Sequence, residues 1–148
     1  MMKKTFIFIL AAFTLFAFSG LLQAADPSIA GVWSMPILKG KDKGQERLNV
    51  EIFEKDGAFY GRIVKISNAP ANAVCTKCKD DKKDKPLMGM QVLRNLKKEA
   101  GRYVGGKIYD VDEGREYKCS LVLISPDKLQ VTATFLFFSE SHYWTRVK

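Results

Sequence analysis

The sequence predicts an all-β fold, a single antiparallel up-and-down β-barrel of about eight strands. Beyond the first two dozen residues, no amphipathic helical period runs long enough to indicate a helix. Short runs of alternating apolar and polar residues dominate instead, and Gly, Pro, Asp and Ser separate them as in turns. A chain of 148 residues with 47% hydrophobic residues suits one domain. Eight strands can close on themselves, which removes exposed edges.

Residues 1–24 are predicted to form a signal peptide. Lys3 and Lys4 give a basic start, the stretch 6–18 is apolar except for Thr14, and Leu22-Gln23-Ala24-Ala25 is a small-residue exit. The apolar run is shorter than the roughly 20 residues that span a bilayer, so cleavage after Ala24 is favoured over a membrane anchor. The expected mature domain is therefore 25–148, periplasmic or secreted.

The charge of the chain argues against nucleic acid as a partner. The 24 Lys and Arg against 16 Asp and Glu give a net charge of +8, and the two lysines of the leader account for part of it. The remaining basic residues are interspersed with acidic ones and form no stripe. A mildly cationic surface is typical of a solvated face, and it would also fit contact with an anionic envelope or membrane surface.

The clearest strand pair is a hairpin over residues 47–66, turning at Asp56-Gly57. A two-residue loop there places Glu51 opposite Arg62 on the outer face and Val50 opposite Ile63 on the inner face. The segment 88–96 could form either a strand or a helical turn. The other strands are expected over residues 32–37, 102–109, 115–124, 129–138 and 141–147.

Apolar residues at alternate positions supply the candidate ligand-binding set. Inward-facing side chains of a small barrel either fill its core or line a cavity. If the barrel is hollow, it should hold a small hydrophobic or amphipathic molecule. If it is filled, the apolar rim near Leu136 and Phe138 favours a protein-interaction module of the envelope. The residues expected to contact a ligand are Val50, Ile52, Ile63, Tyr109, Leu121, Leu123, Val131, Phe135 and Phe137.

One long connection, residues 67–86, interrupts the meander and contains Cys75 and Cys78. The Cys-x-x-Cys spacing is compatible with a redox dithiol, half of a zinc site or a structural disulfide, and an oxidising compartment favours the disulfide. A Cys75–Cys78 bridge is preferred because the two residues share one loop, and a Cys78–Cys119 bridge is the alternative. Loops of this length are often functional, so we expect this one to govern access to the barrel.

The sequence offers no catalytic set, so we expect a protein that is not an enzyme and uses no cofactor or metal. His142, the only histidine, is expected to be solvated after a turn at Ser139-Glu140-Ser141. No Ser-His-Asp order, paired carboxylate motif, phosphate-binding loop or dinucleotide fingerprint is present. Gly105-Gly106 is expected to mark a bend within a strand.

Two short motifs resemble the lipocalin and wider calycin pattern: Gly31-Val32-Trp33 at the first strand and Trp144-Thr145-Arg146 at the last. That resemblance implies a barrel closure in which Arg146 packs on Trp33 as a cation–π plug. With the Cys-x-x-Cys loop and the segments 85–90, 105–110 and 114–117, these motifs resemble the exported bacterial family known as domain of unknown function 2147. The resemblance implies a lipocalin-like barrel without an established reaction. The segment 132–138 is more apolar than the family pattern, so no ligand preference is carried over.

Overall fold

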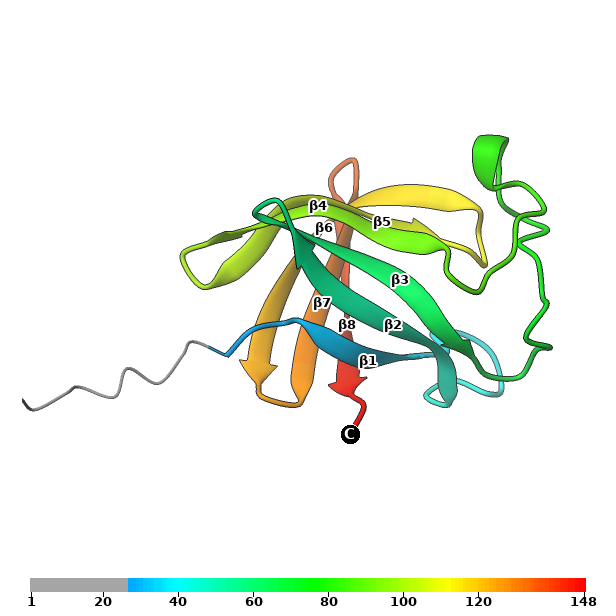
Figure 1. Cartoon of the computed structure of the whole chain (residues 1–148), viewed down its shortest axis with the longest axis horizontal. Coiled ribbons are helices and arrows are strands. Elements are labelled where there is room, and N and C mark those ends of the chain that lie inside the picture. The colour runs from blue at the N-terminus through cyan, green and yellow to red at the C-terminus, as the bar shows by residue number, and fades with distance from the viewer. Residues whose placement is uncertain (1–26) are drawn as a thin grey trace, which may run out of the picture.

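Eight antiparallel strands follow one another around the molecule and close into a barrel, because β8 pairs with β1 (Figure 1). This computed structural model describes residues 27–148, so the predicted signal peptide lies outside it. The predicted fold class is confirmed. No helix within 27–148 has the length and apolar character needed to cross a bilayer. The strands are β1 (Gly31–Pro36), β2 (Glu46–Lys55), β3 (Ala58–Ile66), β4 (Gln91–Glu99), β5 (Arg102–Asp110), β6 (Arg115–Ser125), β7 (Lys128–Phe135) and β8 (Phe138–Arg146).

The β2–β3 hairpin has the predicted register. Val50 faces Ile63 in the core, and Glu51 lies opposite Arg62, whose Nε donates to the Glu51 carboxylate at 2.7 Å. Both turn residues have positive φ, 52° at Asp56 and 75° at Gly57, as expected for a two-residue hairpin loop. Local alternation and turn chemistry therefore agree on this pair of strands.

The segment left open between strand and helical turn is a strand, β4. The next strand, β5, shifts its register against β6 between Tyr103 and Gly106, and Gly105 there takes a φ of +74°, so the predicted bend lies at the glycine pair. A Cβ on Gly106 would lie 2.4 Å from the Leu96 side chain. The second glycine thus lets β4 side chains pack directly against the β5 backbone.

The boundary between the last two strands differs from the prediction. The strand expected over 129–138 ends at Phe135, and β8 begins at Phe138, so the turn is Leu136-Phe137 instead of Ser139-Glu140-Ser141. The turn contains no Gly, Asn, Asp or Pro, the residues that announce a turn in a sequence. The Ser-Glu-Ser segment instead pairs within the sheet as part of β8.

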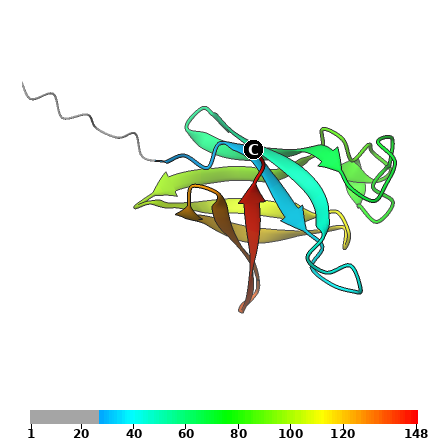
Figure 2. The same cartoon turned by 90° about the horizontal axis from the view of Figure 1, so that it is seen from below.

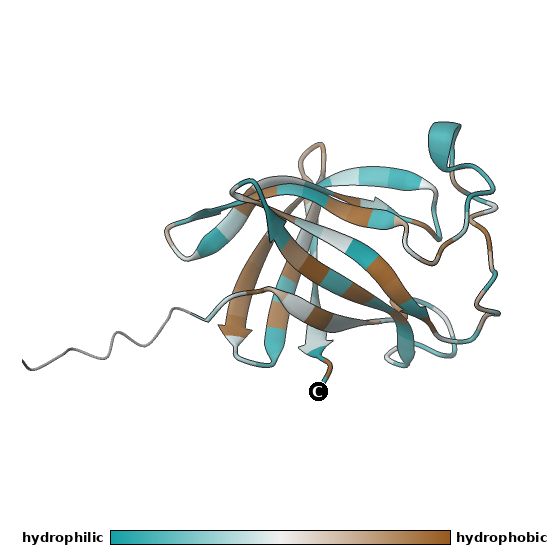
Figure 3. Cartoon of the chain, in the orientation of Figure 1, coloured by the Kyte–Doolittle hydropathy of each residue, from teal (hydrophilic) through white to brown (hydrophobic). Residues whose placement is uncertain are grey.

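One end of the barrel is plugged. Trp33 is fully buried there, and the Arg146 guanidinium lies 4.2 Å from the centre of its ring. The Trp33 indole Nε1 donates to the Ile29 carbonyl at 2.8 Å. Apolar residues alternate with polar ones along the strands around this plug (Figure 3). The buried core here is continuous and contains Ile29, Val50, Ile52, Ile63, Leu93, Leu96, Tyr103, Leu121 and Leu129.

Candidate ligand-binding site

A cavity of about 600 Å³ lies at the other end of the barrel. This open end carries the β1–β2, β3–β4, β5–β6 and β7–β8 connections, whereas the plug closes the end where the remaining turns lie. The volume falls within the roughly 300–1,000 Å³ of small-molecule sites. The barrel is therefore packed in one half and hollow in the other.

The inner part of the cavity is apolar. Met35 lies two positions beyond Trp33 on β1, so it faces inward one layer higher, beside its strand partner Leu48. Val131 and Trp144 come from β7 and β8, where Val131 lies one layer above Leu129 of the packed core. The strict period of two along each strand thus continues the core pattern into the cavity wall. The other apolar residues of this wall are Val92, Ile108, Val111 and Ala133.

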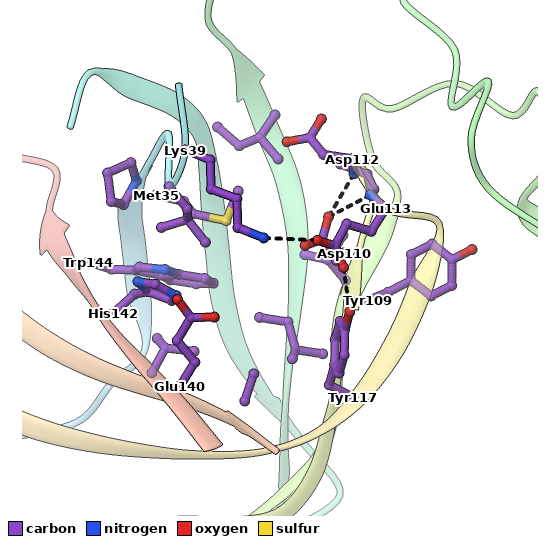
Figure 4. Close-up of a pocket in the computed structure, with 18 of the residues that line it drawn as sticks. Met35, Lys39, Tyr109, Asp110, Asp112, Glu113, Tyr117, Glu140, His142 and Trp144 are labelled. Atoms are coloured by element: carbon purple, nitrogen blue, oxygen red, sulfur yellow. Dashed lines mark hydrogen bonds and ion pairs between the residues drawn. The ribbon is translucent and has the colours of Figure 1, made fainter. Parts of the chain in front are cut away.

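Acidic groups gather on one side of the mouth, in the tight β5–β6 turn (Figure 4). The Asp110 carboxylate accepts hydrogen bonds from the backbone N–H groups of Asp112 and Glu113, at 2.8 and 3.0 Å. Burial raises the pKa of Asp110 above its ordinary value, against the effect of those two bonds. Glu113 accepts from the Tyr117 hydroxyl and from Lys39, and both contacts lower the pKa of Glu113.

Lys39 and β8 form the opposite side of the mouth. Lys39 reaches across from the loop after β1, and its Nζ lies 3.3 Å from the Glu113 carboxylate (Figure 4). On β8, Glu140 and His142 lie across from Ala133 and Val131, so both side chains face the cavity. The His142 Nε2 is 3.4 Å from the Glu140 carboxylate. The site is thus an apolar chamber below a mouth of ionisable groups.

The prediction that His142 is solvated after a turn is wrong. Because β8 begins at Phe138, His142 is the third inward-facing residue of that strand, and only 25% of its side chain is exposed. The alternation Glu140, His142, Trp144 was the available signal, and the apparent Ser-Glu-Ser turn concealed it.

The structure divides the predicted ligand-contacting residues into three groups. Tyr109, Val131 and Phe135 line the cavity, although the Tyr109 hydroxyl points outward and accepts a hydrogen bond from the Lys79 backbone. Phe137 lies in the β7–β8 turn with its side chain in solvent. The remaining predicted residues belong to the packed half of the barrel: Val50, Ile52, Ile63, Leu121 and Leu123.

Sequence reasoning missed most of the mouth. Leu48 and Met35 could have been found by extending the alternation of Val50 and Trp33 by one step. Lys39, Glu113 and Tyr117 carry no comparable signal, because they meet only when the β1–β2 loop and the β5–β6 turn come together at the open end.

Cys75 and Cys78 form the disulfide preferred from the sequence, and Cys119 is a free, buried cysteine. The residues lining the cavity include none from 67–86, so this loop does not cover the mouth as a lid would. It packs outside, against the β5–β6 turn, where a Cβ on Gly114 would lie 1.8 Å from the Lys77 carbonyl oxygen. The loop therefore supports one wall of the cavity. Among residues 27–148, no group of three or more His, Cys, Asp or Glu side chains is placed to hold a metal ion.

A closed eight-stranded up-and-down barrel with one plugged and one open end defines a lipocalin-like β-barrel protein. A family model described as "Uncharacterized protein conserved in bacteria (DUF2147)" matches residues 31–146, and the chain belongs to this family. It is also similar to a solved structure of protein HP1028 from the human pathogen Helicobacter pylori, described as belonging to the lipocalin family. The TM-score is 0.70 at 20% identity over 83% of this chain and 85% of that one, a likeness of fold. A comparison with curated proteins found no match.

Proposed function

We propose that this protein is an exported, non-enzymatic carrier that holds a small hydrophobic or amphipathic molecule in the hollow half of its barrel. The observation that carries the proposal is the cavity of about 600 Å³, with an apolar chamber behind a polar mouth. Small-molecule sites combine these same elements, an apolar lining and a few polar groups that orient the ligand.

The arrangement of the cavity favours an amphipathic ligand over a purely hydrophobic one. Its apolar part would contact Met35, Val131 and Trp144, and its polar group would lie at the mouth. Glu113 on one side, and Lys39, Glu140 and His142 on the other, offer both hydrogen-bond donors and acceptors there. Tyr109 and Phe135 would complete the contacts at the rim.

The interaction module considered from the sequence requires a filled barrel. A cavity well above 300 Å³ favours the carrier instead, because a solid barrel would have no such space. The disulfide between Cys75 and Cys78 likewise favours a structural role for the Cys-x-x-Cys loop over metal binding, because its sulfurs are not available as thiolates.

Native mass spectrometry of protein purified from its own envelope, followed by solvent extraction, tests the proposal. We expect a co-purifying amphiphile and displacement of that molecule by a fluorescent fatty-acid analogue. A protein that carries no ligand and binds no such analogue at micromolar concentration would contradict the carrier function.

A pair of variants on β7 localises the binding. Ala133 lines the cavity, whereas its neighbour Thr132 faces outward and hydrogen-bonds Ser141. Ala133→Phe places a ring in the space that the analogue would occupy and should weaken analogue binding by about tenfold or more, a loss of about 1.4 kcal/mol. Thr132→Phe adds a similar ring outside the barrel and should leave the affinity unchanged. Equal effects of the two variants would place the bound analogue elsewhere.

A further inference from the structure

The β7–β8 turn leaves four consecutive large apolar residues near solvent, Phe135–Phe138, which we call the hairpin tip. Leu136, Phe137 and Phe138 are 74%, 83% and 70% exposed, and Phe135 is 46% exposed. The Phe137 and Phe138 rings lie against each other, with centroids 4.8 Å apart. Single exposed apolar residues are ordinary, but a contiguous exposed group indicates a contact surface.

The backbone of the hairpin tip is strained. Leu136 has a φ of +53° at the first position of a two-residue hairpin turn, where glycine is usual because a Cβ crowds this conformation. Glycine would relieve the strain and present no side chain. Strain of this kind concentrates at functional sites, so the turn indicates a use for the Leu136 side chain.

The hairpin tip adjoins the cavity mouth. Phe135 and Phe138 pair across the hairpin, and both line the cavity. Figure 2 shows the β7–β8 hairpin extending beyond the body of the barrel, with the β1–β2 loop projecting on the same side. A surface that receives the hairpin tip therefore lies next to the opening of the barrel.

Most carboxylates near the cavity mouth are paired with basic side chains. Asp112 pairs with Arg47 at 2.8 Å, and Glu113 pairs with Lys39. The carboxylate of Glu116 is held between Arg94 and Lys107, at 2.6 and 3.0 Å. Glu140 faces the cavity beside His142. These ion pairs reduce the negative charge that would repel an anionic surface.

Basic side chains at the same end lack such partners. Arg115 lies over the Phe135 ring, 5.6 Å from its centre, and Lys118 lies opposite Thr134 on the neighbouring strand. Within residues 27–148, neither is in an ion pair, and the same holds for Lys41 and Lys43 of the β1–β2 loop. Asp42, between the two lysines, and Asp110 at the mouth are also in no ion pair among the described residues, so the four unpaired basic side chains leave a net positive charge around the hairpin tip.

We propose that the hairpin tip inserts into a lipid bilayer that contains anionic phospholipid, with Arg115 and Lys118 at the level of the headgroup phosphates. Aromatic and aliphatic side chains flanked by basic residues are the elements of an interfacial membrane anchor. In this orientation the cavity mouth faces the membrane. Docking requires no bound ligand, so the inference goes beyond the carrier function.

Co-sedimentation of the ligand-free exported protein with vesicles tests the proposal. Vesicles of phosphatidylcholine mixed with phosphatidylglycerol should bind the protein, and vesicles of phosphatidylcholine alone should bind it less. Salt should weaken binding to the mixed vesicles, because the electrostatic part of the attraction is screened. A protein that binds neither kind of vesicle would overturn the proposal.

A double variant tests the role of the hairpin tip while leaving the fold intact. Leu136→Gly suits the positive φ, and Phe137→Ser alters an exposed position, so the protein should fold normally. Losing two inserted apolar side chains should weaken vesicle binding by about tenfold or more. Ile124→Ser removes a half-exposed aliphatic side chain near the plugged end and should leave binding unchanged.

Insertion itself is visible with Phe137→Trp and brominated lipids. A tryptophan at the hairpin tip should be quenched on vesicle binding, whereas the native Trp33 and Trp144 are buried in the barrel. Absence of this quenching, or equal vesicle binding by the parent and the double variant, would overturn the proposal. The proposal would also be overturned if the parent protein formed a dimer but did not bind vesicles, and if the double variant were monomeric. The hairpin tip would then dock a second copy of the chain. A protein that fails to bind the fatty-acid analogue but still docks would refute only the carrier function.

Discussion

Among single residues, Arg146 contacts several of the segments that meet where the barrel closes. Its guanidinium donates three hydrogen bonds to backbone carbonyls, those of Pro126, Ala30 and Ser28, at 2.6, 2.8 and 2.9 Å. The same group lies on the Trp33 ring. One side chain thus joins the chain before β1, the β6–β7 turn and the last strand. Only two residue pairs connect β1 with β8, so these contacts reinforce the narrowest seam of the sheet.

Substitutions at this plug should reduce stability. Trp33→Ala should cost about 3–5 kcal/mol, as is usual for a buried Trp. Arg146→Ala should cost less, because Arg146 is only partly buried and water can replace its hydrogen bonds, which leaves the cation–π contact of about 0.5–2 kcal/mol as the main loss. Arg62 provides a matched control, because its guanidinium also lies over a ring, Phe53, but on the surface. Arg62→Ala should cost below about 1 kcal/mol in denaturant unfolding. Parent-like unfolding of both plug variants would contradict the role of the plug.

Cys119 should be inert in the folded protein. It faces inward on β6 and is almost completely buried, and this burial raises the pKa of its thiol to about 12. The reactive thiolate is therefore scarce at any pH below about 9. Iodoacetamide should leave the native protein unlabelled and should label only Cys119 after unfolding without reductant. Labelling of Cys75 or Cys78 under those conditions would contradict the disulfide.

Among the elements, the disulfide loop and the β5–β6 turn depend on each other. Gly114 has a φ of +64°, and the Lys77 carbonyl occupies the space of its missing Cβ. The loop and the turn also meet at a second point, where the Cys75 sulfur lies 3.4 Å from the Val111 carbonyl oxygen. The turn that presents Asp110 and Glu113 to the cavity is therefore held in place from outside.

Gly114→Ala should displace the loop and reduce the stability of the fold. Gly101→Ala serves as a control, because it measures how much stability is lost from the backbone conformation alone. Gly101 has a similar φ of +77°, but nothing lies within 4 Å of its added Cβ. We expect Gly101→Ala to cost about 1–2 kcal/mol for the left-handed conformation. Gly114→Ala should cost clearly more in thermal unfolding and should also weaken analogue binding. Equal costs would show that the loop does not press on the turn.

Alternation and turn chemistry predicted most of the elements. The β2–β3 register followed from Asp56-Gly57 and from the pairing of Val50 with Ile63, because a two-residue turn leaves one register. The β7–β8 turn could not be predicted in this way, because Leu136 and Phe137 continue the apolar run of β7. A strained apolar turn is invisible to rules built on favourable turn residues. The same error hid the inward direction of His142.

For the whole molecule, the period of two identifies which residues face inward but not whether the inside is full. Leu121 and Val131 pair directly across neighbouring strands and both are buried, yet only Val131 also lines the cavity. Alternation cannot distinguish such partners, because where the cavity begins depends on how all eight tilted strands are staggered around the barrel. Sequence reasoning therefore predicted the barrel and its plug, and it predicted only part of the cavity lining.

This division between a packed and a hollow half should separate stability from binding. Leu121→Ala leaves a void among fully buried neighbours and should cost about 2–5 kcal/mol, with little effect on the affinity of the folded protein for the fatty-acid analogue. Met35 is only partly buried, and Met35→Ala enlarges a cavity that already exists. We therefore expect a loss of stability below about 2 kcal/mol and a clear change in affinity for the analogue. Denaturant unfolding and analogue titration on both variants check this. If Met35→Ala destabilised the protein as strongly as Leu121→Ala without changing the affinity, the open half would behave as core, and the chamber would not be the binding site.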